Sequence, residues 1–183
     1  MDFGKTFTLT AASGAVDYEV FKTLLLEYAA SDLDDSKNST IWQDLTHLPH
    51  RYGAPAGGAL LAHRGDLLAG CGAFAATSHA GISEIKRVYV RSGFRRQGLA
   101  RAITLALVAR ARKCGYHTAA ISTWPHNVQA LALYRQLGFA PVAAFKEHTH
   151  AQLVFLGLAL DQALPQSQEN TNPTSALPLN DHP

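Results

Sequence analysis

The chain has 183 residues, of which 47% are hydrophobic and 16% charged, and its formal net charge is +2 at pH 7. That length suits a single domain with a substantial core, and two cysteines are too few for a disulfide framework. The N-terminus lacks the apolar run of a secretory signal, and no segment reaches the roughly 18 apolar residues of a membrane span, so we expect a cytoplasmic protein that is not membrane-bound.

The two halves of the chain differ in charge. Residues 1–84 hold five Lys or Arg and ten Asp or Glu, whereas residues 86–146 hold eleven Lys or Arg and no acidic residue. Such asymmetry predicts a polyanionic partner for the second half, and nucleic acid, a phosphorylated cofactor and an anionic membrane all qualify.

The first half of the chain predicts a strand, two helices and a hairpin. Phe21, Leu24, Leu25 and Tyr28 recur at helical spacing and indicate an amphipathic helix. In chain order we predict a strand over 6–12, helices over 16–33 and 39–48, a Pro- and Gly-rich loop over 49–58, and strands over 59–63 and 67–76 joined by a tight turn.

The second half mixes strands and helices. In chain order we predict a strand over 83–90, a helix over 98–113, a strand over 117–123, a helix over 127–137, and strands over 140–146 and 151–160. These make seven strands and four helices in an α/β order that has a meander in the middle, unlike a doubly wound sheet. We expect residues 1–161 to form the domain. Residues 162–183, rich in Pro, Asn, Ser and Gln, predict a disordered or loosely packed tail.

A basic turn joins the strand at 83–90 to the helix at 98–113. Arg91, Arg95, Arg96 and Arg101 surround it, and Gly98 opens the helix without a Cβ. The first N–H groups of a helix have no intrahelical partner and its dipole is positive there, so such a turn can cradle a phosphate. It is neither a Walker loop nor a G-x-G-x-x-G turn. A solvated basic turn that only caps the helix is the alternative.

Three motifs in this region resemble one family. The segment RRQGLA (95–100) fits Q/R-x-x-G-x-G/A, the acetyl-coenzyme A signature of the GNAT (Gcn5-related N-acetyltransferase) superfamily. The segment from Asn127 through Ala130 and Tyr134 to Phe139 resembles its second signature, N-x-x-A-x-x-[LF]-Y-x-x-x-GF. The strand EIKRVYV (84–90) resembles the E-[MI]-K-R-[LV]-Y-V of a bacterial subgroup. The resemblance implies a GNAT fold with a mixed, mostly antiparallel sheet, and an acetyltransferase.

The resemblance also implies how acetyl-CoA binds. Backbone amides of the signature turn would hold the pyrophosphate, arginine side chains would add charge, and the preceding strand would bind the pantetheine arm through its backbone. The implied cofactor-binding residues are Val88, Val90, Arg95, Arg96, Gln97, Gly98, Leu99, Ala100, Arg101, Asn127 and Tyr134. Ala100 stands where many members have glycine. No His, Cys and Asp spacing suggests a metal.

Two side chains are the predicted catalytic groups. Tyr134 would protonate the leaving thiolate, because a phenol is neutral at pH 7 and carries a donatable proton. Its alternative is a core aromatic with a satisfied hydroxyl. Asn127, seven residues earlier on the same helix face, can be an N-cap, a cofactor contact or both.

Glu84 is the predicted base that deprotonates the acceptor amine, directly or through a water. An ion pair with Lys86 or a solvated edge carboxylate would be its structural alternatives. His47, His50, His79 and His126 are its rivals as the base.

The acceptor is the open part of this prediction. The resemblance places it against the first two helices, where Tyr28, Asp32, Asp34, Asp35, Trp42, Asp44, His47, His50 and Tyr52 lie. An amine-bearing small molecule or a peptide would fit, and Asp34 or Asp35 could recognise its charge. A nucleic-acid-binding module and an acyl-CoA sensor without turnover are the alternative functions; the first lacks any recognition signature. Residues 151–160 could pair two copies into a homodimer, or form a buried central strand.

Overall fold

The computed structural model describes residues 6–31, 39–146 and 152–160, and their elements follow the predicted order. The elements are β1 (Thr8–Ala11), α1 (Ala15–Ser31), α2 (Ile41–Thr46), α3 (Leu48–Tyr52), β2 (Gly58–Arg64), β3 (Leu67–Ala76), β4 (Ile82–Val90), the 3-10 helix η1 (Ser92–Phe94), α4 (Leu99–Lys113), β5 (Thr118–Thr123), α5 (Val128–Gln136), β6 (Ala140–Pro141) and β7 (Val154–Ala159). The predicted tail, residues 162–183, lies outside the described part.

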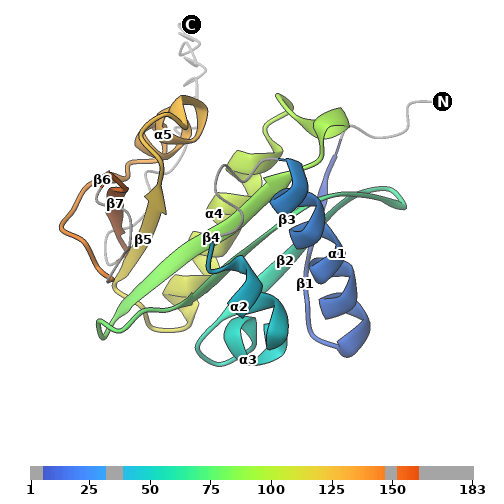
Figure 1. The fold of residues 1–183 in the computed structure, drawn as a ribbon, viewed down its shortest axis with the longest axis horizontal. Coiled ribbons are helices and arrows are strands. Elements are labelled where there is room, and N and C mark those ends of the chain that lie inside the picture. The colour runs from blue at the N-terminus through green and yellow to red at the C-terminus, as the bar shows by residue number, and fades with distance from the viewer. Residues whose placement is uncertain (1–5, 32–38, 147–151, 161–183) are drawn as a thin grey trace, which may run out of the picture.

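One seven-stranded sheet in the order β1-β2-β3-β4-β5-β7-β6 forms the centre of the molecule. Among the described strands only β4 and β5 pair in parallel, so the sheet is mixed and mostly antiparallel, as predicted. Helices α1 to α3 lie on one face of this sheet and α4 on the other (Figure 1). Among the described residues, no helix has the length and apolarity that a membrane crossing needs.

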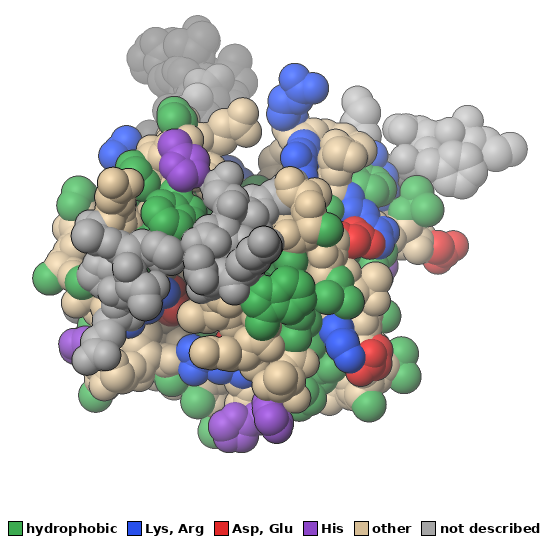
Figure 2. All heavy atoms as spheres, in the orientation of Figure 1, with side chains coloured by type: hydrophobic (Ala, Val, Ile, Leu, Met, Phe, Trp, Pro, Cys, Tyr) green, Lys and Arg blue, Asp and Glu red, His purple; other side chains and the backbone are tan. Residues whose placement is uncertain are grey.

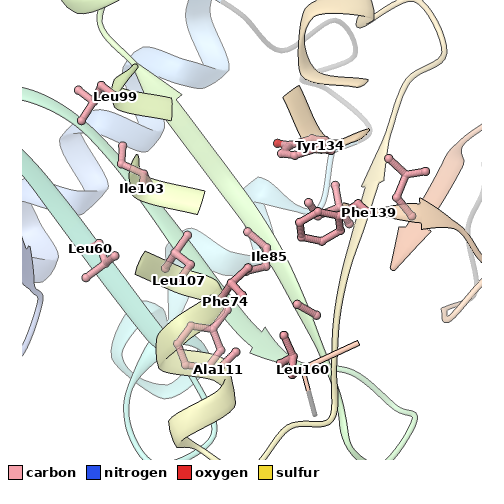
Figure 3. Packing of buried hydrophobic residues seen from close by; sticks show 14 of the residues in the cluster. Leu60, Phe74, Ile85, Leu99, Ile103, Leu107, Ala111, Tyr134, Phe139 and Leu160 are labelled. Atoms are coloured by element: carbon pink, nitrogen blue, oxygen red, sulfur yellow. The ribbon is translucent and has the colours of Figure 1, made fainter. Parts of the chain in front are cut away.

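Two hydrophobic cores follow from this layering. On the α4 face, Ile103 and Leu107 pack with Phe74 and Ile85, and the cluster continues to Tyr134 and Phe139 beyond β5 (Figure 3). On the other face, one cluster buries α1 and its neighbours, with Phe21, Leu24 and Leu25 fully enclosed. These three side chains lie on the apolar stripe that the sequence predicted for this helix.

Two local predictions were wrong. Residues 49–58 were predicted to be a loop, but Leu48–Tyr52 form the short helix α3, a fifth helix. Leu48 and Tyr52 lie four residues apart and are both buried, and Pro49 is tolerated in the first turn. Of the strand predicted over 140–146, only Ala140–Pro141 pair with β7.

After β6 the chain no longer pairs with β7, and the Phe145 and Lys146 side chains contact other residues instead. Pro141 has no N–H to donate, and the ladder ends one residue later with a bond from the Val142 N–H to the Phe155 carbonyl at 3.1 Å. Phe145 then packs edge-on against Phe155, and Lys146 forms an ion pair with Glu84. The last strand, β7, is internal, between β5 and β6.

The sheet splits between β4 and β5. Their pairing covers only Ile82–Glu84 and Thr118–Ala120, whereas β5 stays paired with β7 through Thr123. Within the part of the chain that the structure describes, residues 85–90 of β4 therefore have β3 on one side and no strand on the other, and β4 and β5 diverge (Figure 1). This divergence places a cleft in the middle of the sheet, at the carboxyl ends of two parallel strands.

Candidate active site

A cavity of about 1590 Å³ fills the space between the diverging strands. Its walls are the unpaired side of β4, the basic turn that starts α4, one side of α5, and residues of α1, α2 and α3. In space-filling view a notch at the upper edge of this face separates the part that carries α5 from the part that carries the turn before α4 (Figure 2). The cavity therefore has a basic end at the turn and a second end beside α2.

The basic end is built around the start of α4. Gly98 is its N-cap with φ +81°, a conformation that favours glycine, and no side chain caps the helix. The first helical bond runs from the Ala102 N–H to the Gly98 carbonyl at 3.0 Å, so the N–H groups of Leu99, Ala100 and Arg101 have no intrahelical acceptor. A Cβ built on Gly98 meets no atom within 4 Å, so its α-carbon faces open space.

The predicted site residues nearly all reach this cavity. Those that line it are Glu84, Val88, Val90, Arg95, Arg96, Gly98, Leu99, Ala100, Arg101, Asn127 and Tyr134. Gln97 is not among the lining residues: its side-chain oxygen accepts a bond from Arg64, and its amide donates to the Gly93 carbonyl at 3.1 Å. Arg64 also lies over the Phe7 and Phe94 rings, so Gln97 braces the turn against the neighbouring strands.

The arginines of the turn divide into two kinds. Arg91 forms a bidentate ion pair with Glu27 of α1 at 2.6 and 2.8 Å and donates to the Leu68 carbonyl, so it fastens the turn to the first helix. Arg95, Arg96 and Arg101 line the cavity. The Nε of Arg95 donates to the Val90 carbonyl at 2.8 Å, which is one of the backbone groups expected to face the pantetheine arm.

Tyr134 lies in the middle of the cleft. It projects from α5 and packs its ring against Phe139, with its hydroxyl on the side nearer β4 (Figure 3). Only 9% of the residue is exposed, and burial raises its pKa, so the phenol stays protonated. Within the described residues no hydrogen bond to this hydroxyl is found, unlike the satisfied core tyrosine that was the alternative. Asn127 is the N-cap of α5 and accepts from the Ala130 N–H at 3.4 Å while also lining the cavity.

Glu84 occupies the point where β4 and β5 separate. It is 4% exposed, accepts a hydrogen bond from the Ser122 hydroxyl at 2.9 Å, and forms ion pairs with Lys146 and, at 3.6 Å, with Lys86. Burial alone would raise its pKa, but the two lysines outweigh burial and lower it. The ion pair with Lys86 that the sequence offered as an alternative is therefore present, in the wall of the cavity.

A β-bulge places two cations beside each other at the other end. Arg87 has φ +59°, and the register shifts so that Ala73 pairs with Lys86 but Cys71 with Tyr89. In a regular strand Lys86 and Arg87 would point to opposite faces; the extra residue of a bulge lets both reach Asp44 of α2. Arg87 donates to Asp44 Oδ2 from Nε at 2.9 Å and from Nη2 at 2.6 Å.

The residues predicted for the acceptor end separate into three groups. Tyr28, Asp44, His47 and His50 line the cavity. Tyr52 is buried and donates its hydroxyl to Asp44, and Trp42 is 44% exposed outside the lining. Asp32, Asp34 and Asp35 lie outside the described residues. Of the rival bases, His126 also lines the cavity, stacked on Trp124, whereas His79 lies in the β3–β4 turn outside the lining.

Sequence reasoning missed Lys86, Arg87 and Lys146 as cavity residues. Lys86 and Arg87 are in the strand motif itself, and Arg87 shows no local sign that it occupies a bulge. Lys146 is 62 residues from Glu84, so only the sheet topology brings them together. In the part of the chain that the structure describes, no group of three or more His, Cys, Asp or Glu side chains could hold a metal ion.

Comparison with known proteins fits this architecture. A model of the acetyltransferase (GNAT) family matches residues 19–139. An uncharacterised N-acetyltransferase of Schizosaccharomyces pombe is 26% identical over 157 residues, which is 85% of this chain and 96% of that protein.

Solved structures share the fold. An acetyltransferase of Bacillus subtilis in complex with CoA has a TM-score of 0.60 at 22% identity, with 84% of this chain and 99% of that one covered. The ribosomal-protein-S18-alanine N-acetyltransferase of Escherichia coli has a TM-score of 0.62 at 17% identity, with 88% and 99% covered. The chain therefore belongs to the GNAT family and is an acetyl-CoA-dependent acyltransferase.

Proposed function

We propose that the protein transfers the acetyl group of acetyl-CoA directly to a primary amine of a small molecule or peptide, with both substrates bound in the cleft at once. The observation that carries this is the separation of β4 from β5, which joins the basic turn, Tyr134 and the α2 end in one cavity. Incubation with acetyl-CoA and an amine library should give a mass increase of one acetyl group in at least one amine, with matching thiol release.

In this proposal the basic end holds the CoA phosphates. The N–H groups of Leu99, Ala100 and Arg101 point out of the helix start, where the helix dipole favours an anion, and Arg95 and Arg96 add positive charge. Val88 and Val90 lie on the unpaired side of β4, so their backbone groups are placed to bind the pantetheine amides like an added strand. The hydrogen bond from Arg95 to the Val90 carbonyl must break before that carbonyl can accept from a pantetheine amide.

Tyr134 then acts as the general acid in our proposal. As the acceptor nitrogen forms its bond to the acetyl carbon and the carbon–sulfur bond breaks, the phenol gives its proton to the departing sulfur. Its buried position keeps the phenol protonated across the working pH range. Glu84, directly or through a water, takes the proton that the acceptor ammonium must lose before it can attack. The second proton, which the nitrogen loses as the amide forms, returns the Tyr134 phenolate to a phenol.

The Glu84 assignment predicts a particular pH behaviour. Its pKa lies below the ordinary 4.5, so the carboxylate is ionised at every pH above that value and takes up a proton only below it. Replacing it with glutamine should therefore lower kcat by about 10²-fold, by a factor that stays constant between about pH 5.5 and 8. A base that titrated inside this window would instead make the factor grow with pH. Stopped-flow thiol release at several pH values measures it.

Ser122→Ala is the matched control for that variant. It removes the hydroxyl that bonds Glu84 Oε1 but leaves the carboxylate and both lysine pairs. We expect it to keep most of the activity. The assignment is wrong if Glu84→Gln, folded and binding CoA normally, turns over as fast as the wild type.

Homodimerisation is a further proposal, which the family resemblance suggested. Strand β7 is hydrogen-bonded on both sides over part of its length, and the neighbouring edge strand β6 has two residues. Two copies would therefore meet mainly through side chains of this end of the sheet. Sedimentation of the full chain at micromolar concentration should show a dimer, and a monomer there would exclude it.

A further inference from the structure

Six charged side chains form one cluster beside α2, at the end of the cavity away from the basic turn. We call it the acceptor-side cluster: Asp44, Arg51, Glu84, Lys86, Arg87 and Lys146. All six line the cavity, and within the cluster four cations share two carboxylates. Lys/Arg and His side chains gather on the lower part of the same face in Figure 2, where α2 and α3 lie in Figure 1. The cluster therefore has an excess of positive charge.

Groups other than Lys86 donate the hydrogen bonds that the Asp44 and Glu84 carboxylates accept. Asp44 Oδ2 accepts from Arg87 at 2.6 and 2.9 Å and from the Tyr52 hydroxyl. Glu84 Oε1 accepts from Ser122 at 2.9 Å and from Lys146. Each carboxylate thus already has a partner that bonds it directly.

The Lys86 ammonium is attracted by the Asp44 and Glu84 carboxylates but donates a hydrogen bond to neither. Its Nζ lies 3.6 Å from Asp44 Oδ2 and 3.6 Å from Glu84 Oε2, longer than the about 2.7–3.2 Å of an N–H···O bond. Its side chain is 11% exposed, and across residues 6–31, 39–146 and 152–160 no hydrogen bond from this ammonium is found. An ammonium has three donors, and those of Lys86 lie in the wall of the cavity, where a bound anion could accept from them.

The pKa of Lys86 agrees with this geometry. Burial lowers the pKa of Lys86 to about 8, because the attraction of Glu84 and Asp44 does not make up for the lost hydration. An anion that bonded this ammonium would supply the missing acceptor. Arg51, 44% exposed and 3.7 Å from Asp44, is a second cation at the same end of the cavity.

We propose that the acceptor amine carries a carboxylate on the same molecule, as an amino acid does, and that this carboxylate binds the Lys86 ammonium. The proposal rests on the proposed function, because it names the substrate class of that site. Lys86 is adjacent to Glu84, so a compact acceptor held by its carboxylate would keep its amine near the proposed base. The bond would be charge-assisted, the strong kind of hydrogen bond, because both the ammonium and the carboxylate are charged, and the Arg51 guanidinium would add a second cation beside it.

Matched acceptors that differ only in the carboxylate test this proposal. Phenylalanine, phenylalaninamide and phenethylamine share one skeleton, and corresponding sets can be made for leucine, glutamate and lysine. We expect kcat/KM from thiol release to be about tenfold or more higher for the acid than for its amide or its decarboxylated amine in the preferred set. The amine of the amide loses its proton more easily than the amine of the acid. Amine basicity alone would therefore make the amide, not the acid, the faster substrate of that pair.

Variants of Lys86 show whether this residue produces the preference. Lys86→Met keeps the length and removes the charge, and it should raise KM for the acid about tenfold and bring the acid-to-amide ratio near one, with CoA affinity unchanged. Lys86→Arg should keep the preference for the acid. A purely structural role would weaken acid and amide equally, which would overturn the proposal.

The outcomes separate the two proposals. Equal rates for acid and amide, or a faster amide, overturn the carboxylate proposal and leave the acetyltransferase proposal standing. A preference for the acid that survives in Lys86→Met overturns the role of Lys86. If no amine of these sets or of the amine library is acetylated although CoA binds, the proposed function fails, and the carboxylate proposal fails with it.

Discussion

Gly98→Asp should abolish measurable CoA binding. The α-carbon of Gly98 faces open space at the start of α4, beside three N–H groups with no intrahelical acceptor. A carboxylate there would occupy the position of the phosphate and repel its charge, and it would itself accept from those N–H groups as an N-cap does. We expect affinity to fall by about 10²-fold or more, which is roughly 2.7 kcal/mol, in calorimetry with CoA.

Two control variants separate charge from backbone strain. Gly98 has φ +81°, and asparagine tolerates that conformation better than most residues, so Gly98→Asn brings similar bulk without the negative charge and should bind CoA more tightly than Gly98→Asp. Gly115 has φ +87° and open space at the other end of α4, so Gly115→Asn imposes comparable strain far from the phosphates and should leave affinity unchanged. If folded Gly98→Asp binds CoA as tightly as the wild type, the phosphate cradle is elsewhere.

Tyr134→Phe should have the opposite profile, with CoA affinity kept and kcat lowered by about 10²-fold or more. The ring stays packed against Phe139, and only the hydroxyl that faces the cleft is lost. Because no hydrogen bond to that hydroxyl is found in the described residues, its removal should cost little stability. Calorimetry with CoA and thiol-release kinetics on the same preparation measure the two effects.

Tyr116→Phe is the matched control. Its hydroxyl donates to the Ala56 carbonyl at 2.6 Å outside the cavity lining, so the variant should lose about 1 kcal/mol of stability and keep its kcat. Should Tyr134→Phe retain wild-type kcat, the proton for the leaving thiolate must come from another donor, and Tyr134 would be a packing residue of the α5 core.

The order of elements and the basic turn were predictable because their signals are local. Alternating or helical apolar spacing decides which segments bury a face, and the residues that mark the turn lie in one short segment. Asn127 and Tyr134 are seven residues apart on one helix, so their shared orientation followed from helical geometry. One error was also local: the five residues of α3 lie among prolines and glycines, which favour a loop.

The sequence by itself determined the layered α/β order, the basic turn before α4 and the GNAT resemblance. Only the tertiary structure decided the charged cluster beside α2. Asp44 meets Arg87 across 43 residues, and Glu84 meets Lys146 across 62. These ion pairs depend on the order of strands in the sheet and on the bulge at Arg87. Neither feature produces a periodic pattern in the sequence. From the sequence alone a charged residue is expected in solvent, and it lies buried in a cluster only where distant elements of the fold exclude water from it.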